Sequence, residues 1–256
     1  KKDGSITAMH VDFLLDGGAY TTLSPVVMYR GILHTTLGYR CENVFVDGHV
    51  YRTNTFPNGA FRGFGAPQAI WALEAHMDVC AEKVGMAPHA FRLHNALHVG
   101  DRTATGQVLS EPMGTPDVLE KTLERSQFAA RLPHCSHGKP GQATWYGIGL
   151  AFFGHGSGFT GDGESRLKSK AALDLEYFED GRPGVSIRIS STEMGQGTLT
   201  IMPQIAADAL SLELASVRCP LADTKYAPDS GPTVASRTTM VVGSTVHGAA
   251  LKMRKA

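Results

Sequence analysis

Apolar and polar residues alternate along residues 5–16, which predicts a half-buried β-strand. The apolar face of this strand would carry Met9, Val11, Phe13 and Leu15. Asp16-Gly17-Gly18 interrupts the alternation, and aspartate and glycine are typical of turns. The chain is therefore expected to begin with a strand that ends at this turn.

From residue 66 the apolar positions change to helical spacing, which predicts a helix over 66–84. The apolar positions are Ile70, Leu73, Met77, Cys80 and Val84. Pro67 suits a first helical turn, and Gly85 suits the left-handed residue that follows a helix end. A short helix is predicted next over 88–97. Thr115-Pro116 then predicts the N-cap and first position of a helix that extends to about residue 130.

Residues 134–141 are rich in glycine, proline and polar side chains and predict a linker. The elements predicted after it are strands over 145–153, 171–178 and 185–189, a helix over 198–210, a short strand near 217–221 and a final helix from 246. Residues 179–184 predict a hairpin-like connection between the second and third strands. The fold class is therefore predicted to be α+β, or mixed α/β, in two halves, 1–140 and 141–256.

Composition narrows the class of protein. The 256 residues carry 24 Lys and Arg against 24 Asp and Glu, so no excess of positive charge points to nucleic acid or to a membrane surface. No apolar run is long enough for a membrane span, and no signal peptide precedes Lys1. The chain starts without Met, and its final helical pattern has no stop signal, so we expect a piece of a longer protein.

Four scattered cysteines do not form the close pairs that zinc ribbons and iron–sulfur clusters need. This spacing disfavours such a site within the chain and fits a reducing compartment, which we expect to be the cytoplasm. His94 and His98 have helical spacing for a shared metal, but no third ligand accompanies them, and surface histidines are the better interpretation. The hydrolase motifs G-x-S-x-G and H-E-x-x-H and the Walker A motif are absent from the sequence.

The 29 glycines are the unusual feature of the composition, and many of them fall in four clusters. The first cluster, residues 58–68, is a loop that leads into a helix, where unpaired N–H groups bind anions. It is either a tight turn with an exposed arginine or a site for a flat ligand beside Arg62. The second, residues 154–161, satisfies G-x-G-x-x-G but precedes a strand, so a dinucleotide fold is rejected.

The third cluster, residues 191–198, joins a strand to a helix and leaves Gln196 between two glycines, where its amide could bind a polar group. The fourth, residues 228–239, is rich in hydroxyl groups and opens the last helix, which suits a phosphate or an oxo anion. A capped turn is the simpler alternative for each cluster.

Three segments in this order resemble the molybdenum-cofactor subunit of the xanthine dehydrogenase and aldehyde oxidase family. They are GAFRGFGAPQ at 59–68, TEMGQG at 192–197 and SGPTVAS at 230–236. The resemblance runs through essentially the whole chain and implies two mixed α/β halves that bind molybdopterin between them. It also implies 2Fe–2S and FAD groups on other domains or subunits, and an oligomer.

The resemblance assigns residues to the site. Arg62 and Ala235 would lie near the molybdenum without ligating it, and the other cofactor contacts would be Met194, Gly195, Gln196, Gly197 and Ser236. Phe64 and Phe159 would sandwich an aromatic heterocycle, with Thr160 and Arg30 as further substrate contacts. Arg30 matches the arginine that faces the oxygen of a purine, so xanthine or hypoxanthine, hydroxylated with oxygen from water, is the first choice of substrate.

The catalytic glutamate of the family lies in a G-x-G-E-like segment that this chain does not contain, and upstream glycine-rich loops are also missing. We therefore expect part of an active site that cannot turn over alone. Two alternatives stay open: an aldehyde or nicotinate-type molybdenum hydroxylase, and a non-catalytic domain that binds pterin or phosphate.

Overall fold

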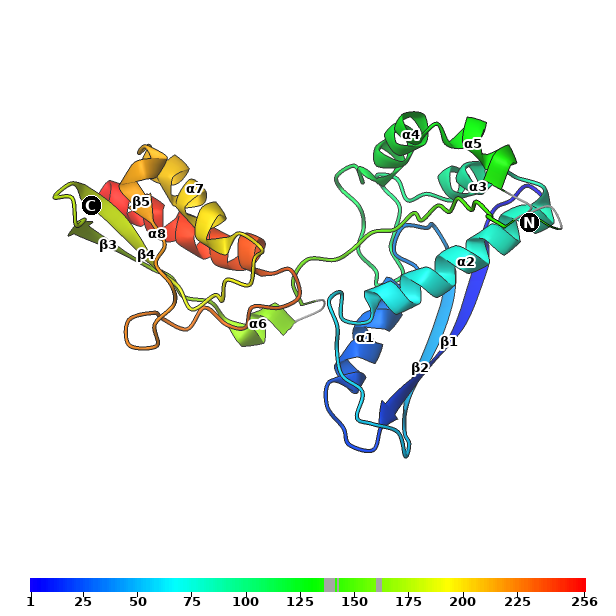
Figure 1. The fold of residues 1–256 in the computed structure, drawn as a ribbon, viewed down its shortest axis with the longest axis horizontal. Helices are drawn as coiled ribbons and strands as arrows, with labels where there is room; N and C mark the ends of the chain where they lie inside the picture. The colour runs from blue at the N-terminus through cyan, green and yellow to red at the C-terminus, as the bar shows by residue number, and fades with distance from the viewer. Residues whose placement is uncertain (136–140, 142, 160–162) are drawn as a thin grey trace. The chain divides into compact units, whose positions relative to one another are not determined.

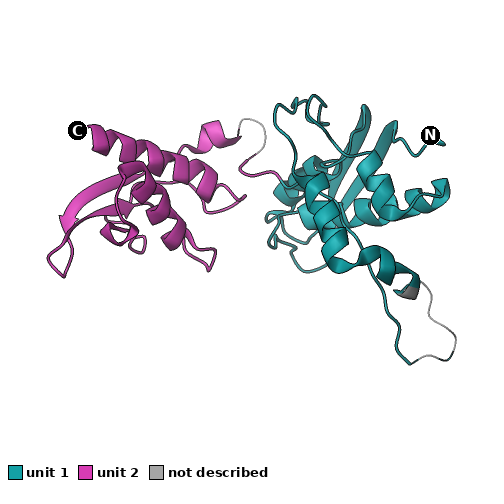
Figure 2. Ribbon diagram, turned by 90° about the horizontal axis from the view of Figure 1, so that it is seen from above, with its two compact units in different colours: residues 1–155 teal, residues 156–256 magenta. Residues whose placement is uncertain are grey.

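The structure, a computed structural model, describes residues 1–135, 141, 143–159 and 163–256. Figures 1 and 2 show two compact units, unit 1 of residues 1–155 and unit 2 of residues 156–256. The division lies after His155, later than the position near 140 that the sequence predicts. The described residues between these positions pack with unit 1 because Phe152 is buried in its core, and the Glu74 carboxylate accepts the Phe152 N–H at 2.6 Å.

Unit 1 begins with a β–α–β arrangement of β1 (Ala8–Gly18), α1 (Ser24–His34) and β2 (Asn43–Arg52). The two strands are parallel, and α1 is the crossover that a parallel pair requires. Gly48 lets α1 lie on β2, because a Cβ at this position would come 2.3 Å from the Ile32 side chain. The predicted first strand is confirmed, whereas α1 and β2 were not predicted.

The helices that follow are α2 (Ala66–Val84), α3 (Pro88–His94), α4 (Thr115–Ser126) and α5 (Phe128–Cys135). The helix predicted over 66–84 is confirmed, with Gly85 left-handed at φ 71°. The helix predicted from 115 to about 130 is wrong in its extent, since the left-handed Gln127 (φ 53°) separates α4 from α5. The N-cap is Gly114 rather than Thr115, and α5 enters the predicted linker as far as Cys135.

The core of unit 1 forms where α2 meets α3, α4 and the segment that contains Phe152. Its buried apolar side chains include Tyr39, Leu73, Met77, Phe91, Leu119 and Phe152. Arg92 is fully buried beside this core and bonds to the Glu74 carboxylate at 2.8 Å, while the Tyr39 hydroxyl donates to the same carboxylate at 2.5 Å. A buried carboxylate needs such donors to offset the loss of hydration.

Unit 2 is a three-stranded sheet packed against two helices. Its elements are α6 (Gly163–Leu167), β3 (Ala172–Tyr177), β4 (Pro183–Arg188), α7 (Thr198–Leu210), η1 (Leu214–Ser216), β5 (Val217–Arg218), the π-helix η2 (Thr238–Val242) and α8 (Gly243–Lys255). β3 and β4 form an antiparallel hairpin, and β5 adds to β4 in parallel. The predicted hairpin and the helix over 198–210 are confirmed.

The strand predicted over 145–153 is wrong. Residues 145–153 form no sheet ladder, and unit 1 accepts the backbone N–H of one of them and of the residue that follows. The Phe152 N–H donates to Glu74, and the Gly154 N–H donates to the Leu37 carbonyl at 3.2 Å.

The core of unit 2 lies between β4 and the two long helices. Its fully or almost fully buried side chains include Val185, Ile187, Met202, Ala206, Val242 and Val246.

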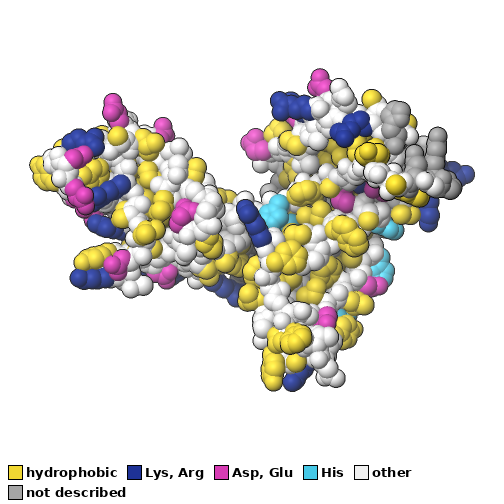
Figure 3. All heavy atoms as spheres, viewed as in Figure 1, with side chains coloured by type: hydrophobic (Ala, Val, Ile, Leu, Met, Phe, Trp, Pro, Cys, Tyr) yellow, Lys and Arg dark blue, Asp and Glu magenta, His cyan; other side chains and the backbone are white. Residues whose placement is uncertain are grey.

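Mixed helix and strand in both units confirm the predicted α+β class. In unit 1, exposed hydrophobic side chains gather over α1 and α2 (Figure 3). The exposed hydrophobic residues of this unit include Tyr29 of α1, Trp71 of α2 and Phe61 of the loop before α2. Within the described ranges, no helix combines the length and apolar character needed to cross a bilayer.

Candidate functional site

In unit 1 the first glycine cluster is pressed against α1. Gly65 is left-handed at φ 103°, and a Cβ there would lie 2.0 Å from the Val27 carbonyl oxygen of α1. Phe64 precedes it with a positive φ of 55°, which is uncommon for a large side chain. Only glycine permits the close approach at position 65, so this contact fixes the loop that carries Arg62 and Phe64 against the helix that carries Arg30.

Arg30 is 6% exposed near the end of α1. Burial lowers the pKa of its guanidinium, which nevertheless remains a cation at neutral pH. One turn later, His34 is also buried, and its Nδ1 lies 2.7 Å from the Arg30 carbonyl oxygen. Because a carbonyl only accepts, Nδ1 carries the proton, and burial lowers the pKa of His34 so that the neutral ring is favoured.

The start of α2 has two features that suit a ligand. Its N-cap, Gly65, makes no side-chain cap hydrogen bond, and the first turn has no acidic residue. Gln68 in that turn has a buried side-chain oxygen without a hydrogen-bond partner among the described residues. Such an acceptor costs about 1–3 kcal/mol if it stays unsatisfied. Arg62, on the loop before α2, is exposed to solvent.

In unit 2 the loop 192–197 is shaped by its own side chains. The Gln196 amide donates to the Thr192 carbonyl at 2.6 Å and to the Thr198 hydroxyl at 2.8 Å, and its oxygen accepts the Met194 N–H at 2.6 Å. Both amide hydrogens are therefore engaged, which leaves one lone pair of the oxygen for a ligand.

Glu193 supports the same loop from the other side. Its carboxylate accepts the N–H groups of Leu199, Gly197 and Gly195, and these bonds hold the pKa of Glu193 below its ordinary value. Gly195 and Gly197 are left-handed at φ 98° and 86°, a conformation that glycine adopts without strain. Met194 between these groups is exposed.

Ala235 and Ser236 form a turn in which both residues have a φ of 54°, and the Ala235 carbonyl accepts the Gly158 N–H at 2.7 Å. This bond places the backbone next to Phe159 against the turn. The Thr192 N–H donates to the Thr233 hydroxyl at 2.9 Å and joins the loop 192–197 to the same segment. Ser190 and Ser230 exchange N–H to hydroxyl bonds at 2.9 and 2.8 Å.

Unit 2 therefore brings Phe159, the loop 192–197 and the turn of Ala235 and Ser236 into one bonded group. Unit 1 brings Arg30 near the loop of Arg62 and Phe64. Thr160 lies outside the described residues. His94, the first histidine of the rejected metal pair, has its Nε2 3.0 Å from the Ser5 hydroxyl. No group of three or more metal-binding side chains occurs in the part of the chain that the structure describes.

Several residues of the site region were not predicted, namely His34, Gln68, Glu164 and Arg237. Gln68 stands inside the quoted first cluster, so the motif itself pointed to it. Glu164 and Arg237 are far apart in sequence and meet only in the folded unit, where their side chains are 3.0 Å apart. No local pattern reveals such a pair.

Comparison with known protein families gives two matches, each described as a molybdopterin cofactor-binding domain. The first covers residues 1–96 and the second covers residues 121–256. These ranges include each of the loops described above, and the segment around Phe152 falls within the second match.

Relatives of full length support the same family. The chain is 32% identical to the nicotinate hydroxylase of Emericella nidulans over 98% of its own length and 18% of that protein. It is 31% identical to the xanthine dehydrogenase/oxidase of Gallus gallus over 97% of its own length, again 18% of the relative. The chain thus spans less than a fifth of each of these two relatives.

A solved structure agrees with the fold. The aldehyde oxidoreductase from Desulfovibrio gigas superposes on 100% of this chain with a TM-score of 0.79 and 29% identity, and the match covers 27% of that protein. The chain therefore belongs to the molybdopterin cofactor-binding family and corresponds to the molybdenum-cofactor-binding region of its xanthine dehydrogenase, aldehyde oxidoreductase and nicotinate hydroxylase relatives.

Proposed function

We propose that the complete protein is a molybdenum hydroxylase that oxidises a nitrogen heterocycle, with a purine such as xanthine or hypoxanthine as the first choice, and that water supplies the oxygen. The observation that carries the choice of substrate is the buried cation Arg30 in α1. A buried cation stabilises negative charge on a bound substrate more strongly than an exposed one because solvent screens it less.

The residues of each unit fit the cofactor. The unpartnered oxygen of Gln68 suits a ligand that brings N–H donors, as a pterin does, and the uncapped start of α2 suits its phosphate. In unit 2, the hydroxyl of Ser236 and the remaining lone pair of Gln196 offer further polar contacts. When bound, molybdopterin supplies the redox chemistry of molybdenum, and the protein supplies binding and orientation.

The roles of the other residues follow the same proposal. Arg62 and Ala235 would lie near the metal, and Met194, Gly195 and Gly197 would contact the cofactor. Phe64 and Phe159 would contact the flat substrate, as would Thr160, which lies outside the described residues. Aromatic side chains bind such a ring by stacking and by edge contacts. The general base is a glutamate outside this chain.

The proposal extends to the partners of the complete protein. Other domains or subunits of an oligomer would hold 2Fe–2S and FAD groups, which would supply electron transfer away from the molybdenum site. The four cysteines are free thiols, which supports a reducing location such as the cytoplasm. A role in purine metabolism belongs to the proposal through its first choice of substrate.

A second candidate is hydroxylation of nicotinate, and the relative from Emericella nidulans favours it. The carboxylate of nicotinate carries a charge that Arg30 could pair with as readily as it could stabilise a purine. A neutral aldehyde, the third candidate substrate, gains nothing from this cation.

The test is the variant Arg30→Met in the complete enzyme, assayed with xanthine, nicotinate and a neutral aldehyde. Loss of a charge-assisted contact worth about 1.5–3 kcal/mol should lower kcat/KM on the purine by roughly 10- to 150-fold and leave the aldehyde nearly unchanged. The matched control is Arg40→Met, because Arg40 is exposed in the same unit. Equal losses on purine and aldehyde would contradict the purine assignment, and a selective loss on nicotinate alone would favour the second candidate.

A further inference from the structure

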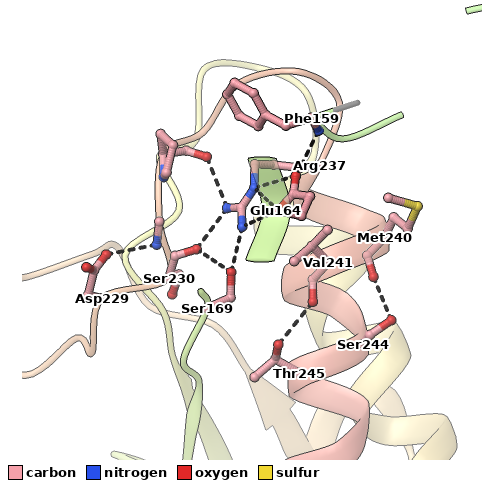
Figure 4. A network of polar contacts seen from close by, with 12 residues as sticks. Phe159, Glu164, Ser169, Asp229, Ser230, Arg237, Met240, Val241, Ser244 and Thr245 are labelled. Atoms are coloured by element: carbon pink, nitrogen blue, oxygen red, sulfur yellow. Dashed lines mark hydrogen bonds and ion pairs between the residues drawn. The ribbon is translucent and has the colours of Figure 1, made fainter. Parts of the chain in front are cut away.

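Arg237 is fully buried in unit 2, directly after the turn of Ala235 and Ser236. Figure 4 shows its guanidinium between Glu164 and the loop of Ser230. Its Nη2 lies 3.0 Å from a Glu164 carboxylate oxygen and 2.7 Å from the Ser169 hydroxyl, and its Nε lies 3.1 Å from both carboxylate oxygens. The third nitrogen, Nη1, donates to the Ser230 carbonyl at 3.0 Å. Every nitrogen of the side chain is therefore engaged.

Glu164 connects this network to the segment of Phe159, the residue predicted to contact the substrate. Its Oε1 accepts the backbone N–H of Phe159 at 3.0 Å. The carboxylate therefore bridges the Arg237 guanidinium and the backbone that presents the aromatic ring. Although burial acts in the opposite direction, the bonds from Arg237 and Phe159 hold the pKa of Glu164 below its ordinary value, so that the bridge is ionised at neutral pH.

Two glycines allow the backbone to close around this ion pair. A Cβ on Gly158 would lie 3.2 Å from the Glu164 Oε1 atom, and one on Gly231 would lie 2.9 Å from the Arg237 Nη1 atom. Gly158 also donates its N–H to the Ala235 carbonyl at 2.7 Å. The segment of Phe159 and the turn of Ala235 are thus joined twice, once through backbone and once through the ion pair.

The turn itself needs support. Ala235 and Ser236 are consecutive left-handed residues, and each costs about 1–2 kcal/mol relative to the ordinary helical conformation. The π-helix η2 begins at the residue after Arg237, and such helices are rare and often lie at functional sites. Strain of this kind persists only where the surroundings hold it.

We propose that Arg237 is a positioning residue, which acts through Glu164 to hold the aromatic ring of Phe159 in register with the Ala235–Ser236 turn of the cofactor site. The Arg237–Glu164 pair would hold these two loops, about 75 residues apart in sequence, in a fixed position relative to each other. This role rests on the proposed function, which assigns Phe159 to the substrate and Ala235 to the cofactor.

The test uses the complete protein with Arg237→Lys, which keeps the positive charge but loses the planar fork of donors. For an aromatic heterocycle the variant should show a KM raised about tenfold, equivalent to about 1.4 kcal/mol. Its KM for a small aliphatic aldehyde, which has no ring to orient, should stay within about twofold. Amide hydrogen exchange at Phe159 and Gly158 should accelerate about tenfold or more, because both amides lose protection when the pair loosens.

Arg218→Lys is the matched control, because Arg218 also pairs with a glutamate in unit 2, at 2.6 Å, but is half exposed and touches neither loop. It should change neither the KM nor the exchange at Phe159. If Arg237→Lys does not fold, Glu164→Gln takes its place, since it keeps an acceptor but places an amide against the guanidinium, and the same changes are expected.

Unchanged exchange at Phe159 and Gly158 in a folded variant would overturn the proposal, and so would equal KM changes for ring and aliphatic substrates. A failure of the proposed function is distinguishable, because the wild-type protein would then contain no molybdenum and oxidise no substrate of the panel. The exchange measurement would still report on the coupling of the two loops in that case.

Discussion

Two fully buried arginines organise the molecule at the scale of single residues. Arg92 in unit 1 bonds to Glu74 and Asp78, and Arg237 in unit 2 bonds to Glu164. A buried guanidinium without partners would be severely destabilising, so each arginine fixes the position of the carboxylates that surround it. In unit 1 the Glu74 carboxylate also accepts the backbone N–H of Phe152. In unit 2 the Glu164 carboxylate accepts the backbone N–H of Phe159.

Acid should weaken the second of these ion pairs. The folded pKa of Glu164 lies below its ordinary value, so the pair contributes its full stability above about pH 4.3, the pKa of an unperturbed glutamate. The contribution declines as the pH falls through the lower folded pKa. At pH 6 we expect the free energy of unfolding of the wild-type protein to exceed that of the Glu164→Gln variant. This difference should shrink as the pH falls toward about 3. Urea unfolding followed by circular dichroism measures both proteins, and a difference independent of pH would contradict the assignment.

The sequence indicated the loops of the candidate site more clearly than the side chains that hold these loops in place. Residues such as Arg62, Gln196 and Ala235 stand inside short glycine-rich motifs, where neighbouring residues identify them. Arg237 follows the last motif directly, yet its burial depends on Glu164, which lies 73 residues earlier in the chain. Pairing over such a distance is decided by tertiary packing, which no local pattern records.

At the scale of elements, helices with regular apolar spacing were predictable and the β–α–β start of unit 1 was not. α2 and α7 have clear periods, with glycines at both ends of α2 and at the start of α7. β2 contains Asp47-Gly48, a pair typical of turns, but Gly48 is there because α1 packs on the strand. The strand predicted over 145–153 is wrong for a related reason, since the Glu74 carboxylate accepts the Phe152 N–H that a ladder could use.

The glycines at the two ends of α2 offer a matched test of how much the close packing of Gly65 on α1 matters. Gly65 and Gly85 are both left-handed, but a Cβ on Gly65 would meet the Val27 carbonyl, whereas a Cβ on Gly85 would meet nothing within 4 Å. Gly85→Ala should therefore cost only the backbone strain, about 1–2 kcal/mol. Gly65→Ala adds a clash and should cost about 2–5 kcal/mol.

Urea unfolding followed by tryptophan fluorescence can measure this difference, because the two tryptophans of the chain, Trp71 and Trp145, both belong to unit 1. Equal costs for the two substitutions would mean that the contact between the loop and α1 does not hold the site as described.

At the scale of the whole molecule, the chain consists of two units with separate cores, and each carries loops that we propose to bind the cofactor. The two family matches, over 1–96 and 121–256, leave the boundary between them open. The assignment of the halves 1–140 and 141–256 to two molybdopterin-binding domains stays a prediction, and the compact units divide later, after His155. A linker rich in glycine and proline marks a change of composition, but packing decides which core the following residues join.

We propose that this chain forms part of the molybdopterin site of a molybdenum hydroxylase. The most direct measurement is the molybdenum and pterin content of the purified complete protein, by elemental analysis and by the fluorescence of the oxidised pterin. We expect molybdenum and pterin in equimolar amounts with the subunit. Pterin or phosphate without molybdenum in the active protein, or neither group, would contradict it.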